Sequence, residues 1–301
     1  MTDDTTLAHA TQFDAKAETV TQLSPLIRRV VCDNPGPFTF TGTCTYIVGH
    51  GDVAIIDPGP ENEGHVAALL DAVKGETVRH IVLTHTHRDH SPASRMLAVK
   101  TDASIVGCAP YVAKTGASSG LDSAHDPDYT PSHVLLDGDL LEGNGFTLEA
   151  VATPGHASNH IAYALREENA LFSGDHVMAW STSIVAPPDG SMTDYMASLD
   201  KLRARGETIY WPGHGGPVKD PQRYMRALAH HRRLREGAIL SRIEAGDTKI
   251  PDMVERIYEN LDPRLKGAAA LSVYAHLEDL VTRGVVRVEG PLSKDATFRK
   301  A

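Results

Sequence analysis

The 301-residue sequence contains little cysteine, few aromatic residues and no long hydrophobic segment. Its three cysteines, Cys32, Cys44 and Cys108, have no CxxC spacing and are odd in number, which argues against a disulfide framework and a thiolate metal site. No run of about 18 apolar residues occurs, and the polar N-terminus lacks the apolar centre of a signal peptide. We therefore expect a cytoplasmic protein without a membrane segment, whose cysteines are small buried residues.

The chain also lacks an overall excess of positive charge, since its formal net charge is -10. Residues 1–220 contain 14 basic and 28 acidic side chains, whereas residues 221–301 contain 15 basic and 11 acidic ones. An acidic body repels polyanions at long range, which counts against nucleic acid as a partner. The excess of basic side chains in residues 221–301 only partly restores nucleic acid as a possible partner.

Three segments are distinguished by their hydrophobic patterns. Residues 1–24 show no periodicity, and we expect them to form a flexible segment or to lie over the surface. Residues 25–220 alternate short apolar runs with helical patterns, which is typical of an α/β domain. The pattern predicts helices over 61–73, from about 91, and over 192–203, and strands over 25–31, 45–48, 53–56, 81–83, 101–106, 146–152, 161–165, 170–173 and 208–210.

From residue 221 the pattern changes to that of a small, mainly helical domain. It predicts helices over 221–245, 250–258 and 267–282, and a short strand pair at 285–289 with a turn at 290–291, which is the outline of a winged helix. The third helix carries Glu278 and Asp279 and few basic residues, which argues against sequence-specific DNA binding. We expect this domain, over residues 221–301, to cover the site or to form a homodimer.

The first helix of that domain carries an unusual group of basic side chains. His230 and His231 lie in the sequence among Arg226, Arg232, Arg233 and Arg235. They have no carboxylate at ligand spacing, so we expect a solvated or domain-interface face, with anion binding as the alternative.

The sequence IVLTHTHRDHS, at residues 81–91, contains the strongest candidate for a functional site. Four potential metal ligands, His85, His87, Asp89 and His90, follow directly after an apolar run. In extended chain, residues two apart point the same way, so His85, His87 and Asp89 are expected to converge and His90 to point elsewhere. Imidazole and carboxylate are ligands that zinc accepts. A solvated polar loop is the alternative, but this density of ligands favours a metal site.

Three further candidates, His156, Asp175 and His214, follow predicted strands in the sequences TPGH, SGDH and PGHG. Neighbouring glycines allow the backbone to turn sharply and to approach the site closely. With these residues included, the set divides into two centres bridged by Asp175: His85, His87 and His156 at one, and Asp89, His90 and His214 at the other.

Two divalent cations a few ångströms apart can share and deprotonate one water molecule and stabilise charge on an attacked carbonyl or phosphoryl oxygen. The candidate site therefore predicts a hydrolase. In this division Asp89 moves from the first centre to the second, and we also expect it to act catalytically by accepting a proton from the bridging water. The cofactor is expected to be two zinc ions, with iron or manganese as alternatives.

The motifs HTHRDH, TPGH, SGDH and PGHG, in this order, resemble those of the metallo-β-lactamase superfamily over residues 25–220. The resemblance implies a four-layer αβ/βα sandwich with the metals at the edge between two sheets. It also implies that Asp57, in the sequence IIDPG, orients a ligand histidine. Thr84 and His160 are further candidates for contacts with a ligand or the substrate, although His160 is equally well explained as a strand-edge residue bonded to backbone.

The details of the motifs separate branches of this superfamily. Members that hydrolyse antibiotics lack the bridging carboxylate that Asp175 supplies, so we do not expect a β-lactamase. The wider order of motifs, together with the C-terminal pattern, resembles the β-lactamase-like protein 2 group, which is associated with endoribonuclease activity on single-stranded RNA. We therefore consider an RNA or other phosphodiester substrate, a thioester or other acyl small molecule of the glyoxalase II type, and an iron-dependent oxidoreductase on the same fold.

Overall fold

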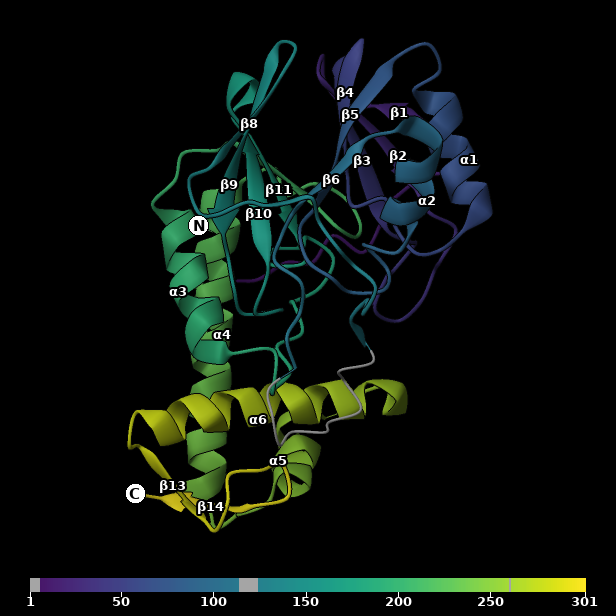
Figure 1. The fold of residues 1–301 in the computed structure, drawn as a ribbon. Helices are drawn as coiled ribbons and strands as arrows, with labels where there is room; N and C mark the ends of the chain where they lie inside the picture. Colours follow the sequence, from purple (N-terminus) through teal and green to yellow (C-terminus); the bar gives the residue numbers. More distant parts are fainter. Residues whose placement is uncertain (1–5, 114–123, 260) are drawn as a thin grey trace.

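The computed structural model describes residues 6–113, 124–259 and 261–301, and it contains two β-sheets packed between two layers of helices (Figure 1). The first sheet has seven strands in chain order, antiparallel from β1 to β4 and parallel from β4 to β7. Its strands are β1 (Thr21–Gln22), β2 (Ile27–Val31), β3 (Cys44–His50), β4 (Asp52–Ile56), β5 (Thr77–Leu83), β6 (Ser104–Gly107) and β7 (His133–Val134).

The second sheet has five strands in the order β12-β11-β10-β9-β8. Its strands are β8 (Leu140–Gly143), β9 (Phe146–Ala152), β10 (Ile161–Leu165), β11 (Ala170–Gly174) and β12 (Ile209–Pro212). Along β10 the side chains alternate between two hydrophobic cores: Tyr163 lies in the core between the sheets, whereas Ala162 and Ala164 lie in the core beneath the outer helices. Both faces of this sheet are therefore buried.

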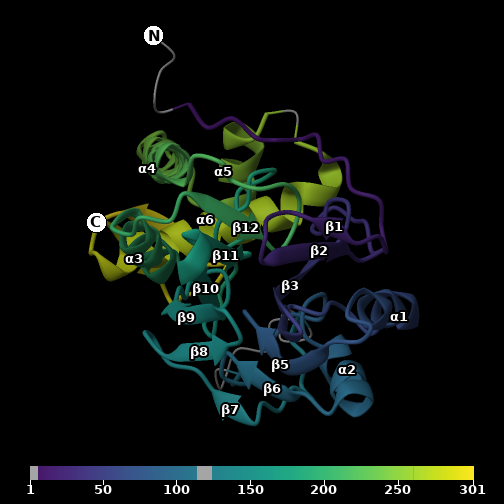
Figure 2. The same ribbon diagram turned by 90° about the horizontal axis from the view of Figure 1, so that it is seen from above.

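Two helices cover each sheet on its outer side. Helices α1 (Glu63–Ala72) and α2 (Ala93–Thr101) lie against the first sheet, and α3 (Met192–Arg203) and α4 (Pro221–Glu244) lie against the second (Figure 2). Side chains of α3 and α4, including Tyr195 and Leu228, are buried in the core beneath β10 and β11. The four-layer αβ/βα sandwich expected from the sequence is confirmed.

The remaining helices and the last two strands form the C-terminal winged helix. It contains α5 (Ile250–Ile257), α6 (Lys266–Thr282) and a two-stranded wing, β13 (Val286–Glu289) paired with β14 (Thr297–Lys300). Helix α6 crosses below α3 (Figure 1), where the Thr193 hydroxyl donates a hydrogen bond of 2.7 Å to Asp279 and Ala275 is buried in the same core as Tyr195. One face of the helix that reads DNA in other winged helices is thus packed against the rest of the chain.

Helix α4 takes part in two separate cores. Its first half contributes Met225 and Leu228 to the core beneath the second sheet, and its second half contributes Ile239 and Ile243 to the core of the winged helix. This helix continues without interruption from one core into the other. The domain boundary expected at residue 221 therefore remains a prediction.

Two strand predictions need correction. The strand expected over 101–106 begins only at Ser104, because Thr101 ends α2 and Asp102 adopts a left-handed conformation (φ 57°) that terminates the helix. The strand pair expected within 285–291 instead joins β13 to β14 across a longer connection, with Val286 opposite Lys300. The buried side chain of Phe298 holds β14 in place.

The N-terminal residues that the structure describes lie along the body of the protein. Phe13 packs against the main core beneath the guanidinium of Arg29, and a Glu18 carboxylate oxygen lies 2.7 Å from Nδ1 of His65. Residues 1–5 of the expected flexible segment, and residues 114–123 between β6 and β7, lie outside the described residues. The three cysteines are buried and unpaired, as expected. Among the helices of the described residues, none has the length and apolar character needed to cross a bilayer.

Candidate metal centre

The candidate ligands come from strand ends that meet at one edge of the two sheets. The segment containing His85, His87, Asp89 and His90 follows β5 of the first sheet. The other three ligands follow strands of the second sheet: His156 comes after β9, Asp175 after β11 and His214 after β12. The site therefore lies where the two layers face each other, as the resemblance implies.

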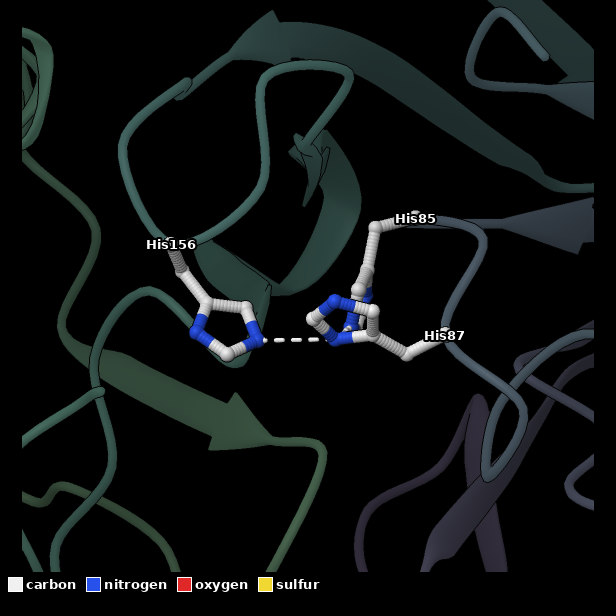
Figure 3. Close-up of side chains that lie close together, drawn as sticks. All are labelled: His85, His87 and His156. Carbon is white, nitrogen blue, oxygen red and sulfur yellow. Dashed lines mark hydrogen bonds between the residues drawn. The ribbon is translucent and has the colours of Figure 1, made fainter. Parts of the chain in front are cut away.

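The first group consists of His85, His87 and His156. Nε2 of His85 lies 2.9 Å from Nδ1 of His87, and Nε2 of His156 lies 3.1 Å from the same atom. Figure 3 shows the three imidazoles with their nitrogens facing one another, His156 approaching from the side opposite to the other two. Their ligand atoms lie within 4.8 Å of one another, so a single cation can contact all three.

The second group consists of Asp89, His90 and His214. Nε2 of His214 lies 3.2 Å from Asp89 Oδ2 and 3.2 Å from Nε2 of His90. Both imidazoles are completely buried, whereas the Asp89 side chain is 30% exposed. The carboxylate of Asp89 is thus the part of this group that reaches solvent.

Asp175 lies between the two groups. One of its oxygens, Oδ2, is 3.7 Å from Nε2 of His156 and 3.4 Å from Nε2 of His214, and the other, Oδ1, is 3.6 Å from Nε2 of His90. Oδ1 is buried without a hydrogen-bond partner among the described residues. A buried carboxylate oxygen without a partner is costly unless an ion or a water molecule satisfies it.

The second ring nitrogen of several candidate ligands is bonded to a fixed acceptor. Nδ1 of His156 donates to the Ile184 carbonyl at 2.6 Å, and Nδ1 of His90 donates to Asp57 at 3.0 Å. Nδ1 of His214 similarly faces the Gly42 carbonyl at 3.3 Å. Each bond orients the ring so that Nε2 points into the site, an arrangement typical of metal-binding histidines.

Asp57 and Thr84 form one connected support beneath the ligands. Asp57 accepts hydrogen bonds from the backbone N–H of Thr84 at 2.8 Å and from its hydroxyl at 2.7 Å, in addition to the bond from His90. The Thr84 hydroxyl also lies 2.9 Å from Nδ1 of His85. A ligand of each group is therefore oriented through the same carboxylate.

His160 lies beneath the site, and its ring does not reach solvent. Its Nδ1 lies 2.8 Å from the Thr153 hydroxyl, and its Nε2 accepts a hydrogen bond from the backbone N–H of Asp175 at 3.2 Å. Both nitrogens are occupied, so in this arrangement His160 positions the backbone of Asp175.

Burial and neighbouring charges divide the histidines of the site into those with a lowered pKa and those with a raised pKa. Burial, followed by the nearby charges of His90 and His87, holds the pKa of His85 well below its usual value, and burial lowers the pKa of His87 to about 3. Burial opposes the charge of His214 too, but Asp175 and Asp89 raise its pKa to about 9. Without metal, the second group therefore consists of protonated imidazoles paired with carboxylates.

The two carboxylates show the reciprocal shift. Although burial raises the pKa of Asp89 and of Asp175, the charges of His90 and His214 outweigh it and hold both values well below the usual range. Both groups are consequently ionised at neutral pH.

The residues present fit a pair of divalent cations. The donors are imidazole nitrogens and carboxylate oxygens, without thiolate, which suits zinc, iron or manganese. A third group with ligand spacing, Glu18, Cys32 and His65, does not fit as well. Burial raises the pKa of Cys32 to about 12, and both His65 nitrogens already contact Thr45 and Glu18.

Glycines beside the ligands allow the close approach of the chain. An added Cβ at Gly213 would lie 2.5 Å from Asp175 Oδ1, inside the site. An added Cβ at Gly155 would lie 2.4 Å from the backbone of Tyr195, and the φ of this residue, 141°, favours glycine. The glycines next to His156 and His214 are thus required by the packing around them.

Two residues near the site carry no signal that sequence reasoning used. His125 lies 2.8 Å from the Thr86 hydroxyl and 3.1 Å from an oxygen of Asp189, and its ring centre is 4.6 Å from that of His87. His125 lies between β6 and β7, and a β-bridge joins it to His87.

Comparisons with known proteins agree with this architecture. Residues 38–214 match the metallo-beta-lactamase superfamily, and residues 250–294 match the beta-lactamase associated winged helix domain. The chain is 30% identical to the beta-lactamase-like protein 2 homolog of Caenorhabditis elegans, over 89% of this chain and 88% of that one. It is 32% identical to the atrochrysone carboxyl ACP thioesterase of Aspergillus terreus, over 68% and 59%. A beta-lactamase domain protein from Burkholderia ambifaria, 19% identical, matches with a TM-score of 0.79 over 95% and 94%.

A four-layer αβ/βα sandwich that gathers histidines and aspartates at one sheet edge defines a metal-dependent hydrolase. The chain belongs to the metallo-beta-lactamase superfamily and carries the winged helix domain associated with it. The resemblance found in the motifs, including that to the β-lactamase-like protein 2 group, is confirmed.

Proposed function

We propose that the protein is a dinuclear metal-dependent hydrolase that cleaves small acyl substrates, with thioesters as the leading class. The observation that carries the proposal is the sharing of Asp175 between two groups of buried ligands. One cation would be held by His85, His87 and His156, the other by Asp89, His90 and His214, with Asp175 contacting both. When bound, zinc or a similar ion supplies Lewis acidity and lowers the pKa of coordinated water.

Asp89 is the residue proposed to act on the proton of the attacking water. It is the partly exposed carboxylate of the set and is ionised, so it can accept a hydrogen bond from an attacking water and orient it. In thioester hydrolysis the water oxygen bonds to the carbonyl carbon, the carbon–sulfur bond breaks, and the departing thiolate takes up the proton that the water loses. The buried histidines are held in one orientation throughout by Asp57 and by backbone carbonyls.

Two observations support an acyl substrate over RNA. Residues 1–220 have 28 acidic and 14 basic side chains, and a repulsive field of this kind opposes a polyanion approaching the site. A relative at 32% identity carries the name of a thioesterase. RNA cleavage is kept as the second candidate because α4 is rich in arginine and the C-terminal part is basic.

A substrate panel tests the proposal. Protein loaded with zinc, and in parallel with manganese or iron, would be assayed against acyl thioesters, lactones, phosphodiesters, single-stranded RNA and β-lactams. Thioester turnover that depends on metal supports the proposal, whereas turnover of RNA alone would replace the acyl substrate by the second candidate.

The metal content of protein purified without added metal is a separate measurement. Two zinc ions per chain agree with a hydrolase. A predominant iron content together with oxygen consumption would contradict the hydrolytic proposal in favour of an oxidoreductase.

A further inference from the structure

A cavity of about 270 Å³ lies between the segment that follows Asp175 and the C-terminal helices. Residues 178–184 form one wall and α4 contributes a second. The third is closed by Ala268, Ala269 and Ser272 of α6 together with Tyr258, Leu261 and Leu265, which lie between α5 and α6. The sandwich and the winged helix therefore both line it, and neither would form it alone.

Much of the lining is apolar. Phe38, Trp180 and Ile184 from the sandwich face Leu261 and Leu265 from the C-terminal part. The ring of Trp180 stacks on Phe40 with ring centres 4.9 Å apart, which holds the indole in a fixed orientation. A rigid apolar wall of this kind suits the hydrocarbon part of a small ligand.

The wall formed by α4 carries two guanidinium groups, those of Arg232 and Arg235. Arg232 is 3% exposed, lies over the ring of Tyr195 and donates one hydrogen bond to the Ser183 carbonyl, while its Nε is buried without a partner. Arg235 is half-buried over the ring of Tyr258 at 4.0 Å. Neither arginine forms an ion pair with a carboxylate among the described residues.

The charge of these two arginines is not balanced by the rest of the lining. No aspartate or glutamate is among the described residues around the cavity. Burial, and then the charges of Arg232 and Arg235, lower the pKa of the neighbouring His231 to about 4, so this imidazole is neutral at pH 7. A buried and a half-buried positive charge without a counter-charge in the lining are costly, and an anion in the cavity would relieve that cost.

Two residues that line the cavity also contact the candidate metal centre. Ile184 lines the cavity, and its carbonyl accepts the hydrogen bond that orients His156. Trp180 lines the cavity as well, and its indole lies against Gly215, the residue after His214. A molecule in the cavity would therefore lie beside residues that support both groups of ligands.

We propose that this cavity binds an anionic group, a carboxylate or a phosphate, carried on the apolar body of the substrate. Arg235 and Arg232 provide the charge, and Phe38, Trp180 and Leu265 provide the apolar contact. The inference rests on the proposed function in that it describes the substrate of the same site. The binding itself requires no metal, so the two can be tested apart.

Calorimetric titration of the full-length protein with three probes tests the proposal. The probes are 4-phenylbutyrate, phenyl phosphate and the uncharged 4-phenylbutanamide, and we expect at least one anion to bind while the amide does not. Preference for the butyrate would identify a carboxylate on the acyl part, and preference for the phosphate would identify a phosphate on the leaving group. Equal binding of the amide would overturn the proposal.

Two matched variants locate the bound anion. Arg235→Gln should weaken anion binding by about tenfold or more because a charged donor is lost, with partial recovery in Arg235→Lys. Arg233→Gln removes the same charge from an exposed position of the same helix and should leave binding unchanged. Equal weakening in both glutamine variants would indicate a general electrostatic effect and overturn the proposal.

The Asp175→Asn variant separates this proposal from the proposed function. Anion binding that persists in Asp175→Asn but is lost in Arg235→Gln places the probe in the cavity, whatever the metal content. Binding lost in Asp175→Asn and retained in Arg235→Gln would mean that the probes bind metal, which overturns the cavity proposal and leaves the hydrolase proposal intact. Binding of a short single-stranded RNA in place of both small anions would also overturn it.

Discussion

Asp175 is the residue on which the two halves of the candidate metal centre depend. It contacts His156 of one group and His90 and His214 of the other, and one of its oxygens has no partner among the described residues. In the proposed arrangement no other side chain contacts both cations. The chemistry of the site should therefore respond more strongly to this residue than to any single histidine.

Replacement of Asp175 by asparagine tests that dependence. The amide keeps the size of the side chain but removes the charge, so we expect the metal content to fall from two ions per chain to one or fewer and activity to be lost. Elemental analysis by mass spectrometry measures the content. Asp200→Asn, at an exposed position of α3, is the control, and two ions per chain in Asp175→Asn would refute the bridging role.

Asp57 is expected to act on the metal through His90 and Thr84. An asparagine at this position can no longer accept all three hydrogen bonds, so the orientation of His90 is loosened. We expect the affinity for metal to fall by about 10- to 100-fold in Asp57→Asn, as is typical for residues that orient a ligand histidine. Competition with a chelator measures this, and Asp52→Asn in the Arg79 ion pair is the control. Unchanged affinity would show that the bond to His90 has no such role.

The pKa shifts predict how pH affects the stability of the metal-free protein. His214 has a raised pKa of about 9 in the folded state against an ordinary 6.5, so its contribution is complete below pH 6.5 and is lost as pH rises through 9. His87, with a pKa lowered to about 3, acts oppositely and reduces stability as pH falls below 6.5. Stability should therefore be highest near pH 6.5.

Denaturant titrations in the presence of a chelator measure this dependence. Between pH 6.5 and 9 the free energy of unfolding should fall by an amount on the order of 3 kcal/mol through His214 alone. In His214→Gln the alkaline decrease should be smaller. A decrease of the same size in this variant would mean that His214 is not the group responsible.

The candidate ligands were predictable because each lies shortly after a strand, four of them together in HTHRDH and the other three in the glycine-containing motifs TPGH, SGDH and PGHG. His125 and Asp189 were not, because neither follows a strand. They reach the site through long-range contacts, a β-bridge from His125 to His87 and the approach of Asp189 to His125. Pattern reasoning has no access to contacts of that kind.

At the scale of elements, strong periodicity predicted the bounds of β9, β10 and α3 to the residue. The failures have local causes. The helix α2 includes Thr101 and ends there because Asp102 adopts a left-handed conformation. The hydrophobic pattern of residues 101–106 does not reveal this conformation. The strands β1 and β7 have two residues each, too few for any periodicity, and they exist only because a neighbouring strand pairs with them.

The helix α4 contains one position at which its sequence is not optimal for a helix. Gly237 is exposed in the middle of the helix, and an added Cβ would meet no atom within 4 Å. Gly237→Ala should therefore raise the free energy of unfolding by about 0.5–1 kcal/mol through the lower entropy of the unfolded chain. Chemical denaturation measures the gain. Loss of stability in this variant would mean that Gly237 lies against another surface.

At the scale of the whole molecule, α4 joins the sandwich to the winged helix. Leu228 and Ile239 are both fully buried but belong to different cores, about 16 Å apart along the helix axis. Helix α6 adds a second connection, through Ala275 in the sandwich core and through the bond between Thr193 and Asp279. Since one uninterrupted helix serves both cores, loss of order in either core removes support from the other.

Thermal or denaturant unfolding should consequently occur in one transition. Ile239→Ala, in the winged-helix core, should cost about 2–5 kcal/mol and shift the midpoint reported by the fluorescence of Trp211, which lies in the core between the sheets. Leu228→Ala should shift the same midpoint to a similar extent. Leu234→Ala, exposed on the same helix, should change it by less than about 0.5 kcal/mol. If Ile239→Ala produced a separate early transition in circular dichroism while the Trp211 midpoint stayed unchanged, the two cores would be independent, and a cavity lined by both could open without unfolding the metal centre.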